Sequence, residues 1–299
     1  MVMRIEARLR AFTGFVRRQS FSGAAEELRI SQPAVSKHIA DLERELGIGL
    51  IDRRSGSLTV AGDFLASHVL RAEAILAQAA YGIGALREPG LGSLSVWAAG
   101  GSGTYLLPDV IASFQQAHPG VRINFKLGTS AEVVDAVRAH HAEIGVAGGG
   151  LAAPEIAVEP LMQDEIVIAG PCSLSGKRLS RDDLESFTWI SREEGSATRV
   201  VADNTLAELG IVPKRRLALP AWESIKLAVR RGYGVAAFSR LVVAEELEAG
   251  TLVVIPFAPW KVRRAICIIY IRDAVLTPPA HQFLLMLRAR WGQTFSSPG

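Results

Sequence analysis

The sequence predicts an α/β protein built from a small helical head, one long helix and two α/β lobes. Three observations lead to this fold class. Residues 21–47 contain two short helix patterns joined by a tight corner, residues 61–88 carry an apolar repeat of four and three, and strand and helix patterns alternate from Ser93 onward. Because 49% of the 299 residues are hydrophobic, the chain is long and apolar enough for two or three compact units.

The head begins with a helix predicted over residues 4–18. Its apolar residues recur at helical spacing, so we expect them to pack behind the second helix of the pair described next; they are Ile5, Leu9, Phe12, Phe15 and Val16. Arg10, Arg17 and Arg18 lie off this stripe, where they contact either solvent or the backbone of a nucleic acid.

Two helices are predicted within residues 21–47, the second beginning after Ser31. Ser31 is a preferred N-cap residue, Pro33 is tolerated in the first turn, and Gly47 is a typical helix end. The spacing of four, three and four predicts one buried stripe on the second helix, formed by Val35, Ile39, Leu42 and Leu46.

The opposite face of this second helix carries the informative chemistry. It combines the amide Gln32, the hydroxyl Ser36 and the cation Lys37 with small residues. Amides read adenine, cations contact phosphates and guanine, and small groups permit close approach to thymine methyls. An ordinary solvated helix face is the alternative for this pattern taken alone.

The whole segment resembles the winged helix-turn-helix of LysR-type transcriptional regulators. The matching residues are Ala24, Ala25, Leu28, Ser31, Gln32, Pro33, Ala34, Val35, Ser36, Lys37, Ile39, Leu42, Glu43, Leu46 and Gly47. The resemblance implies a DNA-binding domain over residues 1–60. The residues that it places on DNA are Ser31, Gln32, Pro33, Ala34, Ser36, Lys37, Arg53 and Arg54.

Arg53 and Arg54 belong to a short two-stranded wing predicted over residues 50–59, with Ser55-Gly56 at its tip. They would lie beside the phosphates or in the minor groove. Residues 1–60 hold ten Lys and Arg and seven acids, whereas the whole chain has a net charge of +3. A basic head on a near-neutral body predicts a polyanion contact confined to the head.

The long helix is predicted to run from about Thr59 to Glu88 and to form the linker of residues 61–88. Its seam predicts pairing with a second copy, and packing within its own domain is the alternative. A two-fold partner also gives a single helix-turn-helix affinity and register, and the resemblance likewise implies a dimer. The predicted dimerisation residues are Leu65, Val69, Ala72, Leu76, Ala79 and Ile83. Residues 89–92 (Pro-Gly-Leu-Gly) are a predicted hinge.

From Ser93 the elements alternate, which predicts parallel sheets with helices on both faces. Strands are expected over 94–98, 121–127, 143–147, 156–159, 166–169, 189–190, 216–219, 235–238, 252–256 and 265–271. Helices are expected over 105–118, 131–142, 182–187, 198–209, 223–231, 240–249 and 279–291. Two lobes crossed twice by the chain is the architecture of periplasmic binding proteins, and the resemblance implies the same fold for an effector-binding domain over residues 93–299. We expect lobe I at about 93–162 and 266–299 and lobe II at about 163–265, with crossovers near 162–165 and 261–265.

Four turns that connect strands to helices are candidate ligand contacts, because open sheets bind ligands beyond the carboxyl ends of their strands. Hydroxyls and backbone N–H groups at several helix N-termini would suit a small anion, although each turn taken alone is explained by ordinary capping. The predicted effector residues are Gly101, Ser102, Thr104, Thr129, Ser130, Ser196, Thr198, Arg199, Glu223 and Ser224. Arg199 would add a countercharge, and Glu223 would repel an anion or recognise a donor.

The segment 191–199 further resembles regulators of carbon fixation or of sulfur and nitrogen assimilation, which respond to small anionic metabolites. The resemblance therefore implies a regulator that binds double-stranded DNA at an interrupted palindrome as a dimer or tetramer, together with an effector and RNA polymerase. A two-lobed solute-binding protein or enzyme without DNA affinity is the alternative.

Other chemistry finds no support in the sequence. His140-His141 and the distant Cys172 and Cys267 have no metal-ligand spacing, so we expect no metal, no cofactor and no catalytic residue. Arginines interrupt the N-terminal apolar residues, and the longest apolar stretch, residues 265–271, is far too short to span a bilayer. We therefore expect a cytoplasmic protein that does not contact membranes.

Overall fold

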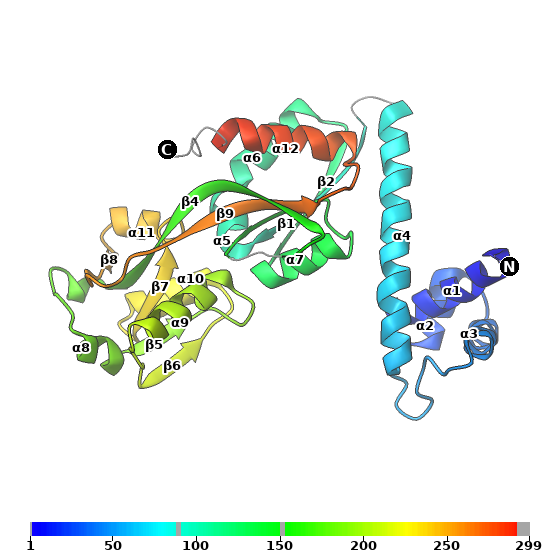
Figure 1. Ribbon diagram of the computed structural model, residues 1–299, viewed down its shortest axis with the longest axis horizontal. Coiled ribbons are helices and arrows are strands. Elements are labelled where there is room, and N and C mark those ends of the chain that lie inside the picture. The colour runs from blue at the N-terminus through cyan, green and yellow to red at the C-terminus, as the bar shows by residue number, and fades with distance from the viewer. Residues whose placement is uncertain (1, 88–90, 150–152, 292–299) are drawn as a thin grey trace. The chain divides into compact units, whose positions relative to one another are not determined.

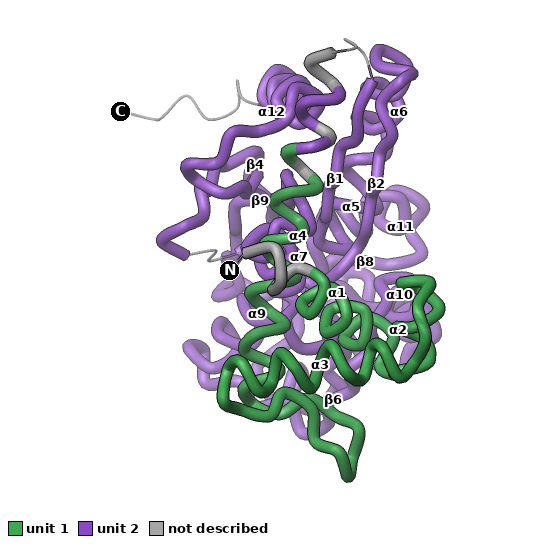
Figure 2. Tube along the Cα trace, turned by 90° about the vertical axis from the view of Figure 1, so that its right-hand side faces the viewer, with its two compact units in different colours: residues 1–79 green, residues 80–299 purple. Residues whose placement is uncertain are grey.

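The computed structural model describes residues 2–87, 91–149 and 153–291. The chain divides into two compact units, Met1–Ala79 and Ala80–Gly299, coloured separately in Figure 2. The boundary falls inside one long helix. Each unit is described by itself.

The first unit contains α1 (Val2–Arg18), α2 (Phe21–Leu28), α3 (Gln32–Leu46) and the first part of α4 (Val60–Arg87). Phe12, Phe15, Val35, Ile39 and Leu42 are buried in one cluster, against which the partly buried Leu9, Val16 and Leu65 pack. The side chain of Ile5 lies outside the described residues. The prediction for Leu46 is wrong, because its side chain is 49% exposed in the last turn of α3, beyond the reach of this core.

The wing is smaller than predicted. A single bridge joins Ile51 and Leu58 in place of two strands. Between them Asp52 accepts hydrogen bonds from the backbone N–H groups of Arg54 and Ser55, and Gly56 takes a φ of 70° in the turn. Gly62 fits α4 against the base of the wing, since a Cβ atom there would lie 2.1 Å from the carbonyl oxygen of Leu50.

The second unit is built on one sheet with strand order β2-β1-β3-β9-β4-β7-β5-β6, and β8 pairs with β4. The strands are β1 (Gly92–Ala99), β2 (Val121–Gly128), β3 (Ile144–Gly148), β4 (Ile156–Pro171), β5 (Thr188–Ser191), β6 (Arg215–Ala218), β7 (Val235–Ser239), β8 (Leu252–Val254) and β9 (Val262–Ile271). In lobe I, β2, β1 and β3 are parallel, and in lobe II, β6, β5 and β7 are parallel.

The two crossing strands correct the prediction of purely parallel sheets. β4 and β9 pair with each other and run antiparallel to their neighbours β7 and β3 (Figure 1). β4 is one strand where two were predicted, with a register shift between Pro160 and Met162. The predicted crossovers therefore lie within paired strands, where Asp164 faces Arg264. Pairing along both crossing strands satisfies backbone groups that a loop would leave exposed. The predicted hinge residues Pro89 and Gly90 lie outside the described residues.

The helices of lobe I are α5 (Gly100–Tyr105), α6 (Pro108–Ala117), α7 (Ser130–Arg138) and α12 (Pro278–Trp291). Those of lobe II are η1 (Cys172–Leu174), α8 (Arg181–Ser186), α9 (Ala197–Glu208), α10 (Trp222–Arg230) and α11 (Ala244–Glu248). The single helix predicted over 105–118 is wrong, because the chain breaks before Pro108. The Gly-rich α5 then precedes α6. Helices α7 and α11 are shorter than predicted.

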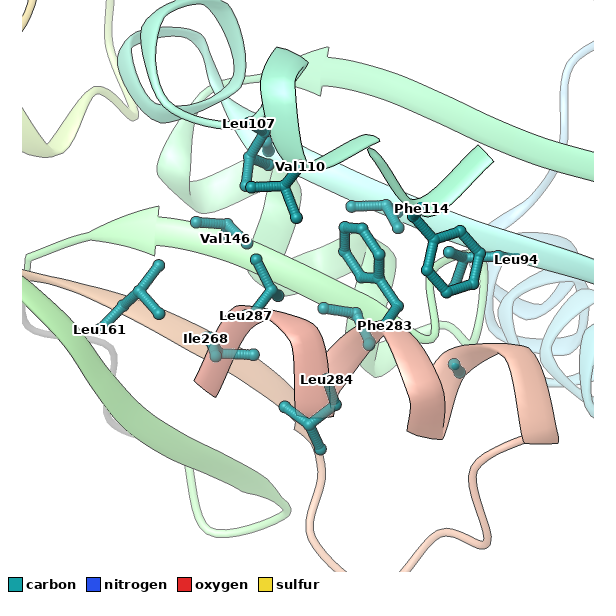
Figure 3. Close-up of a cluster of buried hydrophobic side chains, with 14 of the residues drawn as sticks. Leu94, Leu107, Val110, Phe114, Val146, Leu161, Ile268, Phe283, Leu284 and Leu287 are labelled. Atoms are coloured by element: carbon teal, nitrogen blue, oxygen red, sulfur yellow. The ribbon is translucent and has the colours of Figure 1, made fainter. Parts of the chain in front are cut away.

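Helices cover both faces of each lobe. In lobe I, α6 and α12 bury one face around Phe114 and Phe283, whose rings meet edge to face at 5.3 Å (Figure 3). Helix α7 covers the other face through Val133 and Val137. In lobe II, α8 and α9 pack on one face around Trp189, and α10 packs on the other. This layering leaves the helix N-termini at the strand ends.

Candidate functional site

The exposed face of α3 carries the predicted DNA-reading residues. Ser31 caps the helix, accepting from the backbone N–H of Ala34 at 3.4 Å. Gln32, Pro33, Ser36 and Lys37 are exposed and Ala34 is half-buried. Gln32, Ser36 and Lys37 make no side-chain hydrogen bond or salt bridge with any other residue that the structure describes. Their polar groups are available to a partner.

Several other cations of the head are already paired. Arg8 pairs with Glu45, Arg17 with Glu27 and Glu73, and Arg18 with Glu27. Arg44, on the same helix as Lys37, donates to Asp41 at 2.7 Å. This pairing distinguishes Lys37 from these arginines, each of which already has a carboxylate partner.

The wing arginines are the remaining predicted contacts in the head. Arg54 is exposed, and the side chain of Arg53 is 83% exposed with Glu43 3.8 Å from its guanidinium. At that distance and exposure the ion pair contributes little. Both guanidinium groups are therefore free to meet a phosphate.

The predicted pairing seam of α4 divides between two environments. Leu65 packs on the core of the head, and Val69, Ala72 and Leu76 line a groove with α1 and α2. Leu76 is 70% and Ile83 60% exposed, and Ala79 is also exposed. The C-terminal part of the seam thus presents apolar side chains to solvent, as a surface for a second helix would.

Between the lobes lies a cavity of about 20 Å³, which we call the lobe cavity. That is little more than the ~10–15 Å³ needed by one water, so it suits a ligand of few atoms. Of the predicted effector residues it brings together Gly101, Ser102, Thr129, Ser130, Ser196 and Thr198.

Three helices of eight residues or more begin at the lobe cavity. They are α7 at Ser130, α9 at Ala197 and α10 at Trp222. The side chains of Ser130, Ser196 and Thr198 are buried, and within the described residues their hydroxyls have no hydrogen-bond partner. Helix N-termini and free hydroxyls are the donors that hold an anion.

Four predicted effector residues do not line the lobe cavity. Thr104 and Ser224 are exposed. Arg199 instead bonds the carbonyl oxygen of Arg192 at 3.3 Å and lies 3.5 Å from Asp203. Glu223 accepts a hydrogen bond from the Tyr105 hydroxyl and pairs with Lys226. Thr198 and Trp222, the residues before Arg199 and Glu223, do line the cavity, because successive helical residues point in different directions.

The lobe cavity is also lined by residues outside the ten predicted effector residues: Ala99, Gly100, Gly128, Gly148, Arg192, Ala197, Trp222, Ser239, Arg264 and Ile266. Arg192 and Arg264 are the charged members. Glu193 binds the Arg192 guanidinium through both oxygens at 2.6 and 2.5 Å, and Asp164 binds Arg264 at 3.0 Å. Asp164 also accepts from the Ser239 hydroxyl at 2.7 Å. The 100-residue separation of Asp164 and Arg264 hides this pair from sequence reasoning.

The two positive charges of the lobe cavity are each compensated by a neighbouring carboxylate. Burial lowers the pKa of Arg264, Asp164 opposes that shift, and the nearby positive charge of Arg192 adds to it. Each guanidinium has its own carboxylate, so a ligand would find neutral donors and two already compensated cations. Arg192 also lies 4.6 Å from the centre of the Trp222 ring, which fixes its plane.

A second, wider pocket of about 310 Å³ adjoins the lobe cavity. Its lining is mainly apolar, from Ala131 and Val134 of α7 and Val200 and Val201 of α9. Gly149 and Ala197 approach so closely that a Cβ atom on Gly149 would lie 2.9 Å from the Ala197 side chain. The two spaces share three residues but offer different chemistry.

The next features are metal sites, cysteines and membrane-spanning helices among the described residues. They contain no cluster of three His, Cys, Asp or Glu side chains placed to hold a metal ion. Cys172 is exposed and Cys267 is buried, and both are free thiols. Within residues 2–87, 91–149 and 153–291, no helix is both long and apolar enough to cross a membrane.

Comparison with known proteins assigns both units. Residues 7–63 match the family model described as bacterial regulatory helix-turn-helix protein, lysR family, and residues 87–292 match the LysR substrate binding domain. The chain is 31% identical over 288 residues to the HTH-type transcriptional regulator CysL of Bacillus subtilis (strain 168), covering 95% of this chain and 96% of the relative.

Two further similarities agree. A probable RuBisCO transcriptional regulator from Trieres chinensis is 31% identical over 276 residues, covering 87% of this chain and 89% of the relative. The fold is similar to the crystal structure of full-length CbnR complexed with its target DNA, with a TM-score of 0.69, 21% identity and coverage of 95% and 98% of the two chains. The predicted fold class is confirmed.

Proposed function

The chain belongs to the LysR family of bacterial transcriptional regulators, and from this premise we propose that a small anion bound in the lobe cavity controls how it holds its operator. The relatives are named as transcriptional regulators, which favours this function over the solute-binding protein or enzyme that two lobes alone would permit. The operator is an interrupted palindrome read by paired heads, the natural partner of a two-fold dimer or a dimer of dimers.

The DNA contact rests on α3 and the wing. Gln32, Ser36 and Lys37 face solvent without partners, and Arg53 and Arg54 extend from the wing. We assign base reading to Gln32 and Ser36, and phosphate or guanine contact to Lys37. Ser31, Pro33 and Ala34 shape the start of the helix where it meets the groove. A regulator of this kind acts in the cytoplasm and works with RNA polymerase.

The anion rests on one observation: three helices begin at a cavity that also receives, from three buried residues, hydroxyls without a partner among the described residues. The donors outnumber the acceptors, and each arginine already has its carboxylate. A fully ionised oxyanion or compact carboxylate satisfies these donors without bringing a proton that needs an acceptor. The small volume favours few atoms. The relative named as a RuBisCO regulator supports a metabolite of carbon fixation as one source.

Calorimetric titration tests the ligand. Sulfate, nitrate, phosphate and small carboxylates are titrated into the full chain, which gives the Kd of each. At a hundredfold excess over its Kd, the anion that binds most tightly should raise the free energy of unfolding of the second unit by about 2.7 kcal/mol. Thr198→Val, which removes one cavity hydroxyl and keeps the shape, should weaken that binding about tenfold. Ser173→Ala, outside the cavity lining, is the matched control. Failure of every anion to bind would refute the anionic effector.

The effector then acts on DNA through the geometry of the lobes. A ligand that contacts both lobes binds one lobe arrangement more tightly than another and so shifts their equilibrium. We propose that this shift alters the spacing of the paired heads and the bend of the DNA. Footprinting with and without the anion should show a changed protection pattern. An unchanged footprint with unchanged transcription contradicts this step.

A further inference from the structure

We propose that Tyr105, Glu223 and Lys226 form a clasp that ties lobe I to lobe II beside the lobe cavity and slows the exchange of its ligand. The ligand part of this inference rests on the proposed effector, whereas the tie between the lobes stands on geometry alone. No residue of the clasp lines the lobe cavity.

The clasp joins two helices from different lobes. Tyr105 ends α5 of lobe I, and its hydroxyl donates to Oε1 of Glu223 on α10 of lobe II at 2.6 Å, across 118 residues of sequence. Lys226 Nζ lies 2.7 Å from the same Glu223 oxygen and 2.8 Å from Oε1 of Glu246. The ammonium also lies 5.1 Å from the centre of the Tyr105 ring.

Packing shields the Lys226 end of the clasp, whereas the Glu223 side chain is 74% exposed. The Tyr105 ring packs against the core of lobe II, although the residue belongs to lobe I. The Lys226 side chain is only 8% exposed. Burial alone would lower the pKa of Lys226, but its hydrogen bonds to Glu223 and Glu246 outweigh burial and raise that pKa. The hydrogen bonds from Lys226 and then Tyr105 lower the pKa of Glu223. Glu223 and Lys226 are therefore both charged near neutral pH, and Tyr105 contributes a neutral hydroxyl donor.

The same two helices form the walls of the lobe cavity. Gly100, Gly101 and Ser102 of α5 line it from one side, and Trp222, the residue before Glu223, lines it from the other. A change in the separation of α5 and α10 at the clasp therefore moves both walls.

The contact between these helices also carries an opposing cost. Trp222 Nε1 of α10 and Glu246 Oε2 of the neighbouring α11 are fully shielded from solvent and have no hydrogen-bond partner in the described part of the chain. A Cβ atom on Gly101 would lie 3.5 Å from that indole nitrogen, so the unpaired donor faces lobe I. Unsatisfied buried groups favour separation, and the clasp opposes it. Such a balance makes the seam responsive to the loss of one hydrogen bond.

Hydrogen exchange on the ligand-free full chain tests the clasp directly. Tyr105→Phe removes the donor and Glu223→Leu removes the acceptor of this bond, and we expect exchange in residues 100–105 and 222–230 to rise about tenfold. Because Glu223→Leu already removes the acceptor of the Tyr105 hydroxyl, adding Tyr105→Phe breaks no further bond, and the double variant should exchange no faster than Glu223→Leu alone. Tyr233→Phe and Glu245→Gln, which alter an exposed phenol and an exposed carboxylate of lobe II, should leave exchange unchanged.

Ligand kinetics then separate the clasp from the proposed effector. With inorganic sulfate as the probe, the association and dissociation rate constants should both be higher in Tyr105→Phe than in the wild-type chain. The dissociation rate constant should rise more. Sulfate failing to bind the wild-type chain counts against the proposed effector, while the exchange result still decides the clasp. Unchanged exchange in both single variants, or an additive double variant, overturns the clasp.

Discussion

At Gln32 we propose that a single amide separates specific from general DNA binding. The side chain is exposed and unpaired at the start of α3, where an amide can make two hydrogen bonds to an adenine. Replacing Gln32 by alanine would remove these hydrogen bonds to the base and would leave every cation in place. The consequence should depend on the DNA sequence offered.

We expect Gln32→Ala to weaken cognate binding by about 1–3 kcal/mol and to leave binding to unrelated DNA nearly unchanged. Fluorescence anisotropy on the DNA flanking the gene, compared with a scrambled duplex at the same salt, measures both. Equal losses on the two duplexes would rule out base reading by Gln32.

Lys37 and Arg44 form a matched pair on one helix, because only Arg44 has a carboxylate partner. Lys37→Ala should weaken binding and reduce the slope of log affinity against log salt by about 1 if it neutralises a phosphate. Arg44→Ala should change that slope far less. A larger effect at Arg44 would mean that its pairing with Asp41 does not persist on DNA.

Glu143 is a buried carboxyl of lobe I whose pKa burial raises, although the Thr277 hydroxyl at 2.6 Å and the Ser95 N–H at 3.4 Å oppose the shift. A carboxyl with a higher pKa in the folded chain stabilises the fold fully below its unfolded pKa of about 4.3, and this contribution is lost as pH rises through the folded pKa. Glu143→Gln is neutral throughout. The melting temperature of the variant relative to wild type should therefore be more favourable at pH 8 than at pH 5, by scanning calorimetry. Glu245→Gln is the control, and a difference that does not change with pH would count against a protonated Glu143.

At the scale of the element, α4 shows how one periodic seam meets two environments. Its first member, Leu65, belongs to the core of the head, while Leu76 and Ile83 remain exposed. Periodicity identified an apolar face, but it did not distinguish an internal neighbour from a second chain.

Leu76→Asp should convert a dimer to a monomer at micromolar concentration, because a charge would be buried in the paired seam. Sedimentation velocity gives the mass, and circular dichroism checks that the helix content is kept. Ser67→Asp, exposed on the same helix, should leave the mass unchanged. A dimer that survives Leu76→Asp would place the interface elsewhere.

Helices α5 and α6 show where local reasoning was insufficient. Tyr105 was assigned to the start of a helix ending at His118, but it ends α5 instead, and a break precedes Pro108. Three glycines among residues 100–103 have low helix propensity, so local composition does not indicate α5. Close packing explains this composition, since a Cβ atom on Gly103 would lie 2.2 Å from the Leu127 side chain.

At the scale of the whole molecule, the two compact units have separate hydrophobic cores. Scanning calorimetry should therefore resolve two transitions. Phe12→Ala should lower the transition temperature of the head alone, and Phe114→Ala that of the second unit alone. Each substitution should reduce the free energy of unfolding of its unit by about 3–5 kcal/mol. The smaller unit should show the larger shift, because a domain of 60–100 residues loses about 4–8 °C per kcal/mol. A single transition that both variants lower equally would show that the units unfold together.

What the sequence determined by itself was local. The cap at Ser31, the stripe of Val35, Ile39 and Leu42, and the order of strands and helices depend on neighbours a few residues apart. Periodicity and propensity report such contacts directly. The family resemblance rests on the same local motif, and the comparisons confirm it.

The tertiary structure decided the composition of the lobe cavity. Six predicted residues met there because helix N-termini converge, but Arg192 and Arg264 joined them from strands or strand ends whose pairing is set at long range. Glu223 turned to Tyr105, 118 residues away, and away from the cavity. Which strand ends face each other depends on the pairing of β4 with β9, and that long-range register leaves no short-range trace in the chain.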